Sequence, residues 1–560
     1  MAGVAAIADV AGRRPLVLLA ALLSALVAGL PGQVVAAPGA ATPAATTPCR
    51  LPGVAHAALC GTLQRALDPQ RPDGTQITIH YAVLPALARH KAADPVVFFA
   101  GGPGQGAIAL ARTLAARFGR WGQRRDLVFV DQRGTGRSAP LRCADDDERS
   151  ALQPLADALA DMPQRLARLQ TCRQALQALP YGDLRYFTTT LAVADIDAVR
   201  QALGAARINA FGASYGTRAV LEYMRQFPTH VRRAVLDGVA PPDMQLAAAA
   251  ARDNQAALDA LLDGCSSQPA CKAQHPALRA QWQALLASLP RLVALPHPLS
   301  GRTETVLLQR DTLLGLVRAP LYAPALAAAL PAALQAAAEG DWAPLLALAS
   351  GLGGGAAGGI NSGLHFSVVC AEDLAPATAS RSTASAATGN PSIGKPPASN
   401  PPGNEFGNSF ASLYAQACAS WPRAVVPAAF YRVPPAPAPV WLLSGGLDPV
   451  TPARHGQRVA QALGALARHT VVPNAGHGVS GLACVRDALG RFISAEADAA
   501  ALAVPATVAD CAAALPRPLA FVLPGAAIKP AHPTGQPAAV PAPPASGARS
   551  RTITTPPTVR

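Results

Sequence analysis

Residues 207–224 read Arg207-Ile-Asn-Ala-Phe-Gly-Ala-Ser-Tyr-Gly-Thr-Arg-Ala-Val-Leu-Glu-Tyr-Met224, which predicts a short apolar strand, a sharp turn and a helix. The turn contains Gly212-Ala-Ser-Tyr-Gly216, which has the GxSxG spacing of a nucleophile elbow. Many GxSxG matches in a glycine-rich chain are ordinary turns, but the strand, turn and helix that this motif requires are all predicted here. Ser214 is therefore the candidate nucleophile, and the backbone N–H of Tyr215 is a candidate oxyanion donor.

The segments around this stretch alternate between apolar runs and helical patterns. Continuous apolar runs separated by helices are typical of buried parallel strands. We therefore expect an α/β fold, with a mostly parallel central sheet flanked by helices. The expected strands lie at residues 76–84, 95–100, 126–131, 208–211 and 231–237, and the expected helices lie at 107–118, 191–203 and 217–227.

The pattern changes between residues 241 and 439, where Ala and Leu recur at helical spacing with hardly any strand-like run. We expect a large, mainly helical cap domain here, inserted between residues 38–240 and 440–523 of the sheet domain. Two stretches within it, near 351–363 and 380–407, have the composition of flexible loops. The α/β pattern then resumes, with strands expected at 440–444 and 469–472 and helices at 452–466 and 482–493.

The two ends of the chain differ in composition from the rest. Residues 1–37 contain two arginines, a short apolar run and small residues that suit cleavage near Ala36 or Ala37, which is the layout of a secretory signal peptide. A membrane anchor is the alternative, but the apolar run is shorter than the ~20 residues that a span needs. We expect export to the periplasm or the exterior, with no stable membrane span after cleavage. Residues 524–560, rich in Pro, Ala, Ser and Thr, predict a disordered tail.

Ten cysteines in an exported chain indicate disulfides rather than a metal or redox site. Spacing alone cannot establish which cysteines pair, so pairing of neighbours along the chain is a working hypothesis. It gives Cys49–Cys60, Cys143–Cys172, Cys265–Cys271, Cys370–Cys418 and Cys484–Cys511. The net charge of +14 is scattered without a basic block, so we expect no nucleic-acid partner. We expect no metal or other cofactor, and the sequence leaves the oligomeric state open.

A catalytic serine needs a histidine that accepts its proton and a carboxylate that orients this histidine. Asp448 follows the strand expected at 440–444, and His477 follows the strand expected at 469–472. The order serine, acid, histidine, with each residue on a loop after a strand, is the order that a GxSxG hydrolase uses. Asp448 precedes a proline, so an ordinary turn aspartate is the alternative. For His477 the alternative is a surface or packing histidine.

The loop Gly101-Gly-Pro-Gly-Gln-Gly106 follows the strand expected at 95–100. We expect the N–H of Gly102 to be the second oxyanion donor, since Pro103 has no N–H. A phosphate-binding loop is the alternative, but no Lys-Ser or Lys-Thr pair follows and the glycines do not fit a GxGxxG pattern.

Five motifs in this order resemble the secreted α/β-hydrolases of the proline iminopeptidase and tripeptidyl aminopeptidase family. They are Gly101-Gly-Pro-Gly104, Asp131-Gln-Arg-Gly-Thr-Gly-Arg-Ser138, Gly212-Ala-Ser-Tyr-Gly-Thr217, Asp448-Pro-Val-Thr-Pro452 and Gly476-His-Gly478. The resemblance runs from about residue 49 to residue 511, and it is strongest to the tripeptidyl aminopeptidase branch. Ala100 and Tyr215 replace a histidine and a tryptophan of the proline iminopeptidases, so the resemblance does not imply strict proline specificity.

The resemblance implies a serine exopeptidase that removes a single residue, such as proline, or a tripeptide from peptides with a free N-terminus. Such an enzyme needs acidic groups for the α-ammonium group, because an unpaired buried charge is strongly unfavourable. In the expected cap, Glu372 and Asp373 are the candidates, and a helix cap or a surface ion pair is the alternative role.

Two other functions remain in competition with this one. An esterase, a lipase or a small-molecule amidase would use the same three residues with a different cap, and the core motifs do not separate these activities. A catalytically silent envelope-binding protein that uses the basic tail is the other hypothesis. The complete set of catalytic residues argues against it.

Overall fold

The computed structural model describes residues 46–146, 152–350, 359–374 and 403–521. The predicted signal peptide and tail lie outside these ranges, as do residues 351–358 and 380–402 of the two predicted loops. The first predicted loop ends earlier than expected, because helix α13 begins at Ser362.

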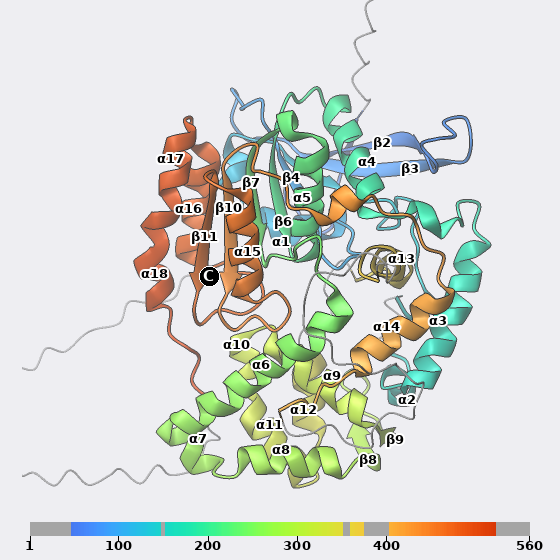
Figure 1. Cartoon of the computed structure of the whole chain (residues 1–560), viewed down its shortest axis with the longest axis vertical. Helices are drawn as coiled ribbons and strands as arrows, with labels where there is room; N and C mark the ends of the chain where they lie inside the picture. Colours follow the sequence, from blue (N-terminus) through green and yellow to red (C-terminus); the bar gives the residue numbers. More distant parts are fainter. Residues whose placement is uncertain (1–45, 147–151, 351–358, 375–402, 522–560) are drawn as a thin grey trace, which may run out of the picture. The chain divides into compact units, whose positions relative to one another are not determined.

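The described residues include a nine-stranded sheet (Figure 1). Its strand order is β1-β2-β3-β5-β4-β6-β7-β10-β11; the pairs from β5 to β11 are parallel and the pairs from β1 to β5 are antiparallel. The mostly parallel α/β sheet expected from the sequence is thus confirmed. The strands are β1 (Thr47–Cys49), β2 (Ala58–Ala66), β3 (Gln76–Leu84), β4 (Val96–Phe99), β5 (Leu127–Val130), β6 (Ile208–Ala213), β7 (Val231–Asp237), β10 (Val440–Gly445) and β11 (Ala467–Val472).

Helices cover both faces of this sheet, which is why β4 and β5 are buried at every residue. Successive side chains of a strand point to opposite faces, so Ala210 and Phe211 of β6 lie in two different hydrophobic cores. One core also contains side chains of α4 (Thr189–Ala202), α5 (Tyr215–Gln226) and α15 (Ala453–Leu463). The other contains side chains of α1 (Ala111–Arg117), α16 (Ala483–Ser494), α17 (Asp498–Ala503) and α18 (Ala509–Ala514).

A mainly helical segment lies between β7 and β10 in the chain. A separate core, with Trp282, Leu313 and Leu334 among its buried members, holds much of this segment together. Its helices are α6 (Leu246–Ser267), α7 (Pro269–Gln274), α8 (Leu278–Ala287), α9 (Arg310–Leu321), α10 (Pro324–Ala327), α11 (Leu330–Ala338), α12 (Ala343–Ser350), α13 (Ser362–Glu372) and α14 (Ser409–Ser420). Helices α2 (Leu155–Ala158) and α3 (Met162–Gln177) precede β6.

Two features of this segment differ from the expectation. It contains an antiparallel hairpin, β8 (Arg291–Pro296) with β9 (Thr303–Leu308). Both faces of β8 carry apolar residues, with Val293 buried and its neighbour Leu292 exposed, so the sequence shows no polar–apolar alternation. In addition, most of the buried apolar side chains of α13 and α14 belong to the core of the sheet domain rather than to the separate core.

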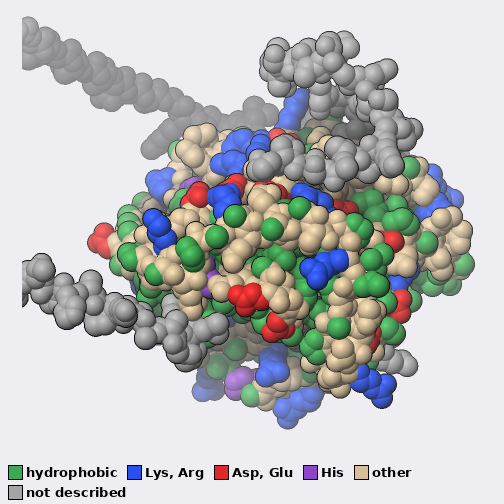
Figure 2. Space-filling view, turned by 90° about the horizontal axis from the view of Figure 1, so that it is seen from below, with side chains coloured by type: hydrophobic (Ala, Val, Ile, Leu, Met, Phe, Trp, Pro, Cys, Tyr) green, Lys and Arg blue, Asp and Glu red, His purple; other side chains and the backbone are tan. Residues whose placement is uncertain are grey.

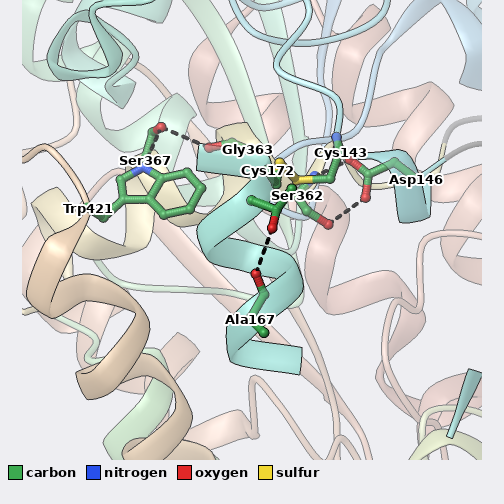
Figure 3. Close-up of a disulfide and its surroundings, with 9 residues drawn as sticks. Cys143, Asp146, Ala167, Cys172, Ser362, Gly363, Ser367 and Trp421 are labelled. Atoms are coloured by element: carbon green, nitrogen blue, oxygen red, sulfur yellow. Dashed lines mark hydrogen bonds between the residues drawn. A yellow bond between two sulfur atoms is a disulfide. The ribbon is translucent and has the colours of Figure 1, made fainter. Parts of the chain in front are cut away.

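All ten cysteines form disulfides, and the five pairs are those expected from neighbours along the chain. The Cys143–Cys172 bond ties the loop after β5 to α3 (Figure 3). Within this loop Asp146 accepts hydrogen bonds from the backbone N–H of Ser362 at 2.7 Å and from its hydroxyl at 2.5 Å. The disulfide therefore helps to fix the N-terminus of α13.

Charged side chains are interspersed with apolar ones on the face shown in Figure 2, and they form no continuous basic surface there. In the described ranges, no helix combines the length and the apolar character needed to cross a membrane. The same ranges contain no group of three or more His, Cys, Asp or Glu residues arranged to hold a metal ion.

Candidate active site

Ser214 lies at the sharp turn between β6 and α5, with φ of +56° and ψ of −126°. A non-glycine residue with positive φ is strained and must be held in place by its surroundings. The N–H of Ser214 donates a hydrogen bond of 2.8 Å to the carbonyl oxygen of Asp237. A Cβ atom at Gly216 would lie 2.1 Å from the carbonyl oxygen of Phe99, and one at Gly212 would lie 2.4 Å from that of Gly216. Both glycines of the motif are therefore required for this turn.

Asp448 and His477 come from the loops after β10 and β11 and are in direct contact. The distance between His477 Nδ1 and Asp448 Oδ2 is 2.8 Å. The other carboxylate oxygen of Asp448 accepts hydrogen bonds from the N–H groups of Val450 and Thr451, at 2.8 and 2.9 Å. The hydroxyl of Thr451 donates to Oδ2 at 2.7 Å. These donors fix a fully buried carboxylate so that it faces the imidazole.

The two residues shift each other's pKa. Burial raises the pKa of Asp448, but the charge and hydrogen bond of His477 and the N–H groups of Thr451 and Val450 outweigh burial, so this pKa lies below its ordinary value. Burial lowers the pKa of His477, but the charge and hydrogen bond of Asp448 outweigh it, so this pKa lies above its ordinary value. An imidazole that gains stability on protonation is suited to accept a proton from a nucleophile.

Residues at the end of strand β7 contact both the turn that carries Ser214 and the loop that carries His477. Gly238 directly follows Asp237, and a Cβ atom there would lie 3.2 Å from Cε1 of His477. The carboxylate of Asp237 also accepts hydrogen bonds from the N–H groups of Val479 and Ser480, at 2.8 and 3.0 Å. The described part of the protein shows no hydrogen bond between the Ser214 hydroxyl and His477. Such bonds are often long until substrate binds.

The glycine loop after β4 lies against the nucleophile. A Cβ atom at Gly101 would lie 3.4 Å from Cβ of Ser214. Gly102 has φ of +111° and precedes a cis peptide bond to Pro103. Within the described ranges, the N–H groups of Gly102 and Tyr215 have no hydrogen-bond acceptor, which is the state expected of oxyanion donors.

Residues of the motif at 131–138 support this loop. Asp131 accepts hydrogen bonds from the N–H groups of Ile108 and Arg137, at 3.0 and 3.2 Å. Arg133 and Asp195 form a buried bidentate ion pair with distances of 2.7 and 2.9 Å. These contacts give the motif at 131–138 a structural role, because they join the glycine loop after β4 to α4.

Glu372 and Asp373 lie at the end of α13 and are buried in a network with the elbow helix. Glu372 accepts hydrogen bonds from the N–H and the hydroxyl of Thr189, at 2.7 and 2.8 Å. Asp373 pairs with Arg218 of α5 at 2.5 Å and accepts from the N–H of Leu246 at 3.0 Å. Burial raises the pKa of Glu372 to about 7. Every carboxylate oxygen thus has a donor within the protein, and the ion pair of Asp373 with Arg218 is buried rather than on the surface.

Several residues near the site carried no signal in the sequence. Tyr322 follows α9; its carbonyl oxygen accepts the N–H of His477 at 2.9 Å, and its ring contacts the His477 ring edge-to-face with centroids 5.3 Å apart. His365 lies 3.2 Å from the carbonyl oxygen of Pro103 and 2.7 Å from the hydroxyl of Tyr414. Burial lowers the pKa of His365, so the neutral ring donates to Pro103 and accepts from Tyr414.

Comparison with known proteins establishes the family. Residues 94–306 match the model of the alpha/beta hydrolase fold, and residues 403–499 match that of the TAP-like protein. Carboxylesterase B of Mycobacterium tuberculosis is 31% identical over 436 residues, which are 73% of this chain and 78% of that protein. The chain therefore belongs to the α/β-hydrolase family and has a TAP-like C-terminal region.

Two peptidases are similar over shorter stretches. Serine protease Hip1 of M. tuberculosis is 31% identical over 224 residues, which are 37% of this chain and 42% of that protein. Tripeptidyl aminopeptidase of Streptomyces coelicolor is 30% identical over 195 residues, which are 33% of this chain and 35% of that protein. The similarity thus spans less than half of the length of these two relatives.

Proposed function

We propose that this protein is a serine hydrolase that releases N-terminal residues from peptides through an acyl-enzyme. The observation that carries the proposal is the pair of Asp448 and His477, 2.8 Å apart, beside the strained turn of Ser214. A serine in such a turn projects its hydroxyl away from the sheet, toward the loops that carry the acid and the histidine.

The geometry supports the following sequence of steps. Ser214 Oγ attacks the scissile carbonyl carbon while Nε2 of His477 accepts the hydroxyl proton. Asp448 keeps the remaining proton on Nδ1 and stabilises the imidazolium that forms. The N–H groups of Gly102 and Tyr215 stabilise the oxyanion, and His477 then gives its proton to the leaving amine. A water molecule, deprotonated by His477, hydrolyses the acyl-enzyme and frees the serine.

Peptides with a free N-terminus are the proposed substrates, on the basis of the similarity to two peptidases. Hydrolysis of carboxylic esters is the second candidate, because the match that covers most of this chain is to a carboxylesterase. We also propose that the protein is exported, and its five disulfides support this, because such bonds persist in oxidising compartments.

A panel of chromogenic substrates separates these activities. It compares aminoacyl and tripeptidyl anilides, each with a free and with an acetylated N-terminus, and short acyl esters. An exopeptidase that binds the α-ammonium group loses roughly 2–5 kcal/mol on acetylation, which corresponds to a loss in kcat/KM of about thirty-fold to several thousand-fold. Equal cleavage of free and acetylated peptides would refute the exopeptidase assignment. Turnover of esters alone would establish the esterase.

A further inference from the structure

A cavity of about 420 Å³ lies between α3, α6, α9 and α14, apart from the three candidate catalytic residues. This volume is in the range of pockets that bind small ligands. Its lining combines apolar side chains, such as Phe406, Phe410 and Leu314, with a few charged and polar ones. The charged residues of the lining are Asp161, Arg165, Asp311 and Arg318.

Asn254 of α6 lines this cavity and has a buried side-chain acceptor. It is only 2% exposed, and its side-chain oxygen has no hydrogen-bond partner. A buried polar atom without a partner costs about 1–3 kcal/mol, so a donor supplied to this oxygen by a bound ligand or a water molecule would stabilise the site.

The two acidic residues of the lining differ in their contacts. Asp161 accepts a hydrogen bond from the N–H of Gln164 at 2.9 Å and caps α3. The carboxylate of Asp311 has neither a hydrogen bond nor an ion pair among the described residues. Asp311 is therefore the carboxylate of the lining that has both oxygens available to a cationic group of a ligand.

Arg318 links one end of the cavity to the candidate catalytic histidine through the side chain of Tyr322. Its guanidinium donates to the hydroxyl of Tyr322 at 2.6 Å and lies over the Tyr322 and Phe410 rings, 5.3 and 5.0 Å from their centroids. Tyr322 in turn contacts His477 through its ring and its carbonyl oxygen. The Nε atom of Arg318 is buried without an acceptor.

Helix α9 sets the distance between the Asp311 end and the Arg318 end of the cavity. Asp311 and Arg318 lie on the same face of this helix, which rises about 1.5 Å per residue, so Asp311 is about 10 Å further from the His477 end. Three residues of extended peptide span about the same distance.

We propose that this cavity binds the N-terminal residues of the peptide substrate, with the α-ammonium group paired to Asp311. Asn254 accepts a hydrogen bond from a peptide N–H, and Arg318 donates to a peptide carbonyl close to the scissile bond. The proposal rests on the proposed exopeptidase function, and it assigns the amine site to Asp311 instead of Glu372 and Asp373. A pocket of this length favours the release of a short peptide over the release of a single residue.

The first test compares kcat/KM for a tripeptidyl anilide with a free amine and for its acetylated form, and uses their ratio within each variant. Asp311→Asn is expected to lower this ratio at least tenfold. Asp73→Asn, which removes an equal charge on an exposed loop, serves as the matched control and should keep the wild-type ratio. An unchanged ratio in Asp311→Asn would overturn the proposal, and a loss of the ratio in Glu372→Gln instead would place the amine at α13.

The second test blocks the cavity. Gly315 lies on α9 between Asp311 and Arg318, and a Cβ atom there would meet no atom within 4 Å. Gly315→Phe can therefore fill the cavity without a clash at Cβ, and the loss of a helical glycine favours the helix. In a Ser214→Ala background, this substitution should weaken the binding of a free tripeptide amide at least tenfold by calorimetry. Unaltered binding would overturn the proposal.

The outcomes separate the two levels of the assignment. If the wild type cleaves only esters, or does not distinguish free from acetylated peptides, the proposed function itself fails. If the wild type makes the distinction and either Asp311→Asn or Gly315→Phe behaves like wild type, the exopeptidase stands and the proposed subsite fails.

Discussion

Replacing Asp448 with asparagine should remove most of the activity without unfolding the protein. The asparagine carbonyl oxygen can still accept the N–H groups of Val450 and Thr451, which bond to Oδ1 of the aspartate. The amide NH₂ group then faces Nδ1 of His477 in place of an acceptor. It favours the tautomer with the proton on Nε2, and this imidazole cannot accept the proton of Ser214.

The expected loss can be estimated from the role of this carboxylate. A wrong tautomer and an unstabilised imidazolium reduce kcat by about ten-thousandfold in the comparable Ser-His-Asp system. This factor corresponds to about 5.4 kcal/mol in the activation free energy. The loss should fall on kcat, because Asp448 lies behind the histidine and does not contact substrate.

The pH profile supplies a second signature. Because Asp448 holds the pKa of His477 above its ordinary value, wild-type activity should fall as the pH drops below this raised pKa. In Asp448→Asn the attraction is lost, and the acid limb of the residual activity should move to lower pH.

Steady-state kinetics from pH 5 to 9 and a thermal unfolding curve measure these effects. A loss of less than tenfold, with an acid limb at the wild-type position, would show that Asp448 is not the acid of the site. A large fall in Tm would trace the loss to folding.

Three further predictions concern the framework. Burial raises the pKa of Glu372 from 4.5 to about 7, so between these pH values the folded protein keeps a proton that the unfolded chain has released, and the stability should fall as the pH rises. The fall in Tm with pH should be shallower in Glu372→Gln, and parallel curves of Tm against pH for the variant and the wild type would contradict the shift. Gly216→Ala should cost about 1–3 kcal/mol of folding free energy because its Cβ would meet the Phe99 carbonyl oxygen, and an unchanged Tm would refute this contact. A thiol reagent should find almost no free thiols in the denatured, unreduced protein, and reduction should lower Tm, since a disulfide typically contributes about 2–4 kcal/mol. A count of nearly ten free thiols would contradict both the disulfides and the proposed export.

The sheet and the neighbourhood of the candidate catalytic residues were predictable because both depend on local patterns. A buried parallel strand reads as a continuous apolar run, and Ser214 and Asp448 follow such runs, whereas His477 follows β11, a partly exposed edge strand. The carboxyl ends of parallel strands lie at one edge of the sheet, so the position of each residue after a strand was enough to predict that the three residues lie close together.

Contacts between distant segments were not predictable in this way. Thr189 and Glu372 are 183 residues apart, and no local pattern indicates that a threonine of α4 donates hydrogen bonds to both carboxylate oxygens of this glutamate. The same holds for Tyr322, which contacts His477 only because α9 ends against the loop after β11. Asp311 and Asn254 look like ordinary helical residues in the sequence, and only the packing of α6 and α9 places them at one cavity.

The most direct test of the proposed catalytic site is covalent labelling. A fluorophosphonate probe reacts with a serine only when a neighbouring base activates it, and peptide mass spectrometry locates the modified residue. We predict a single adduct on Ser214 of the folded protein, with no adduct after heat denaturation or in Ser214→Ala. Labelling of another residue, or no labelling of active protein, would contradict the assignment of Ser214 as the nucleophile.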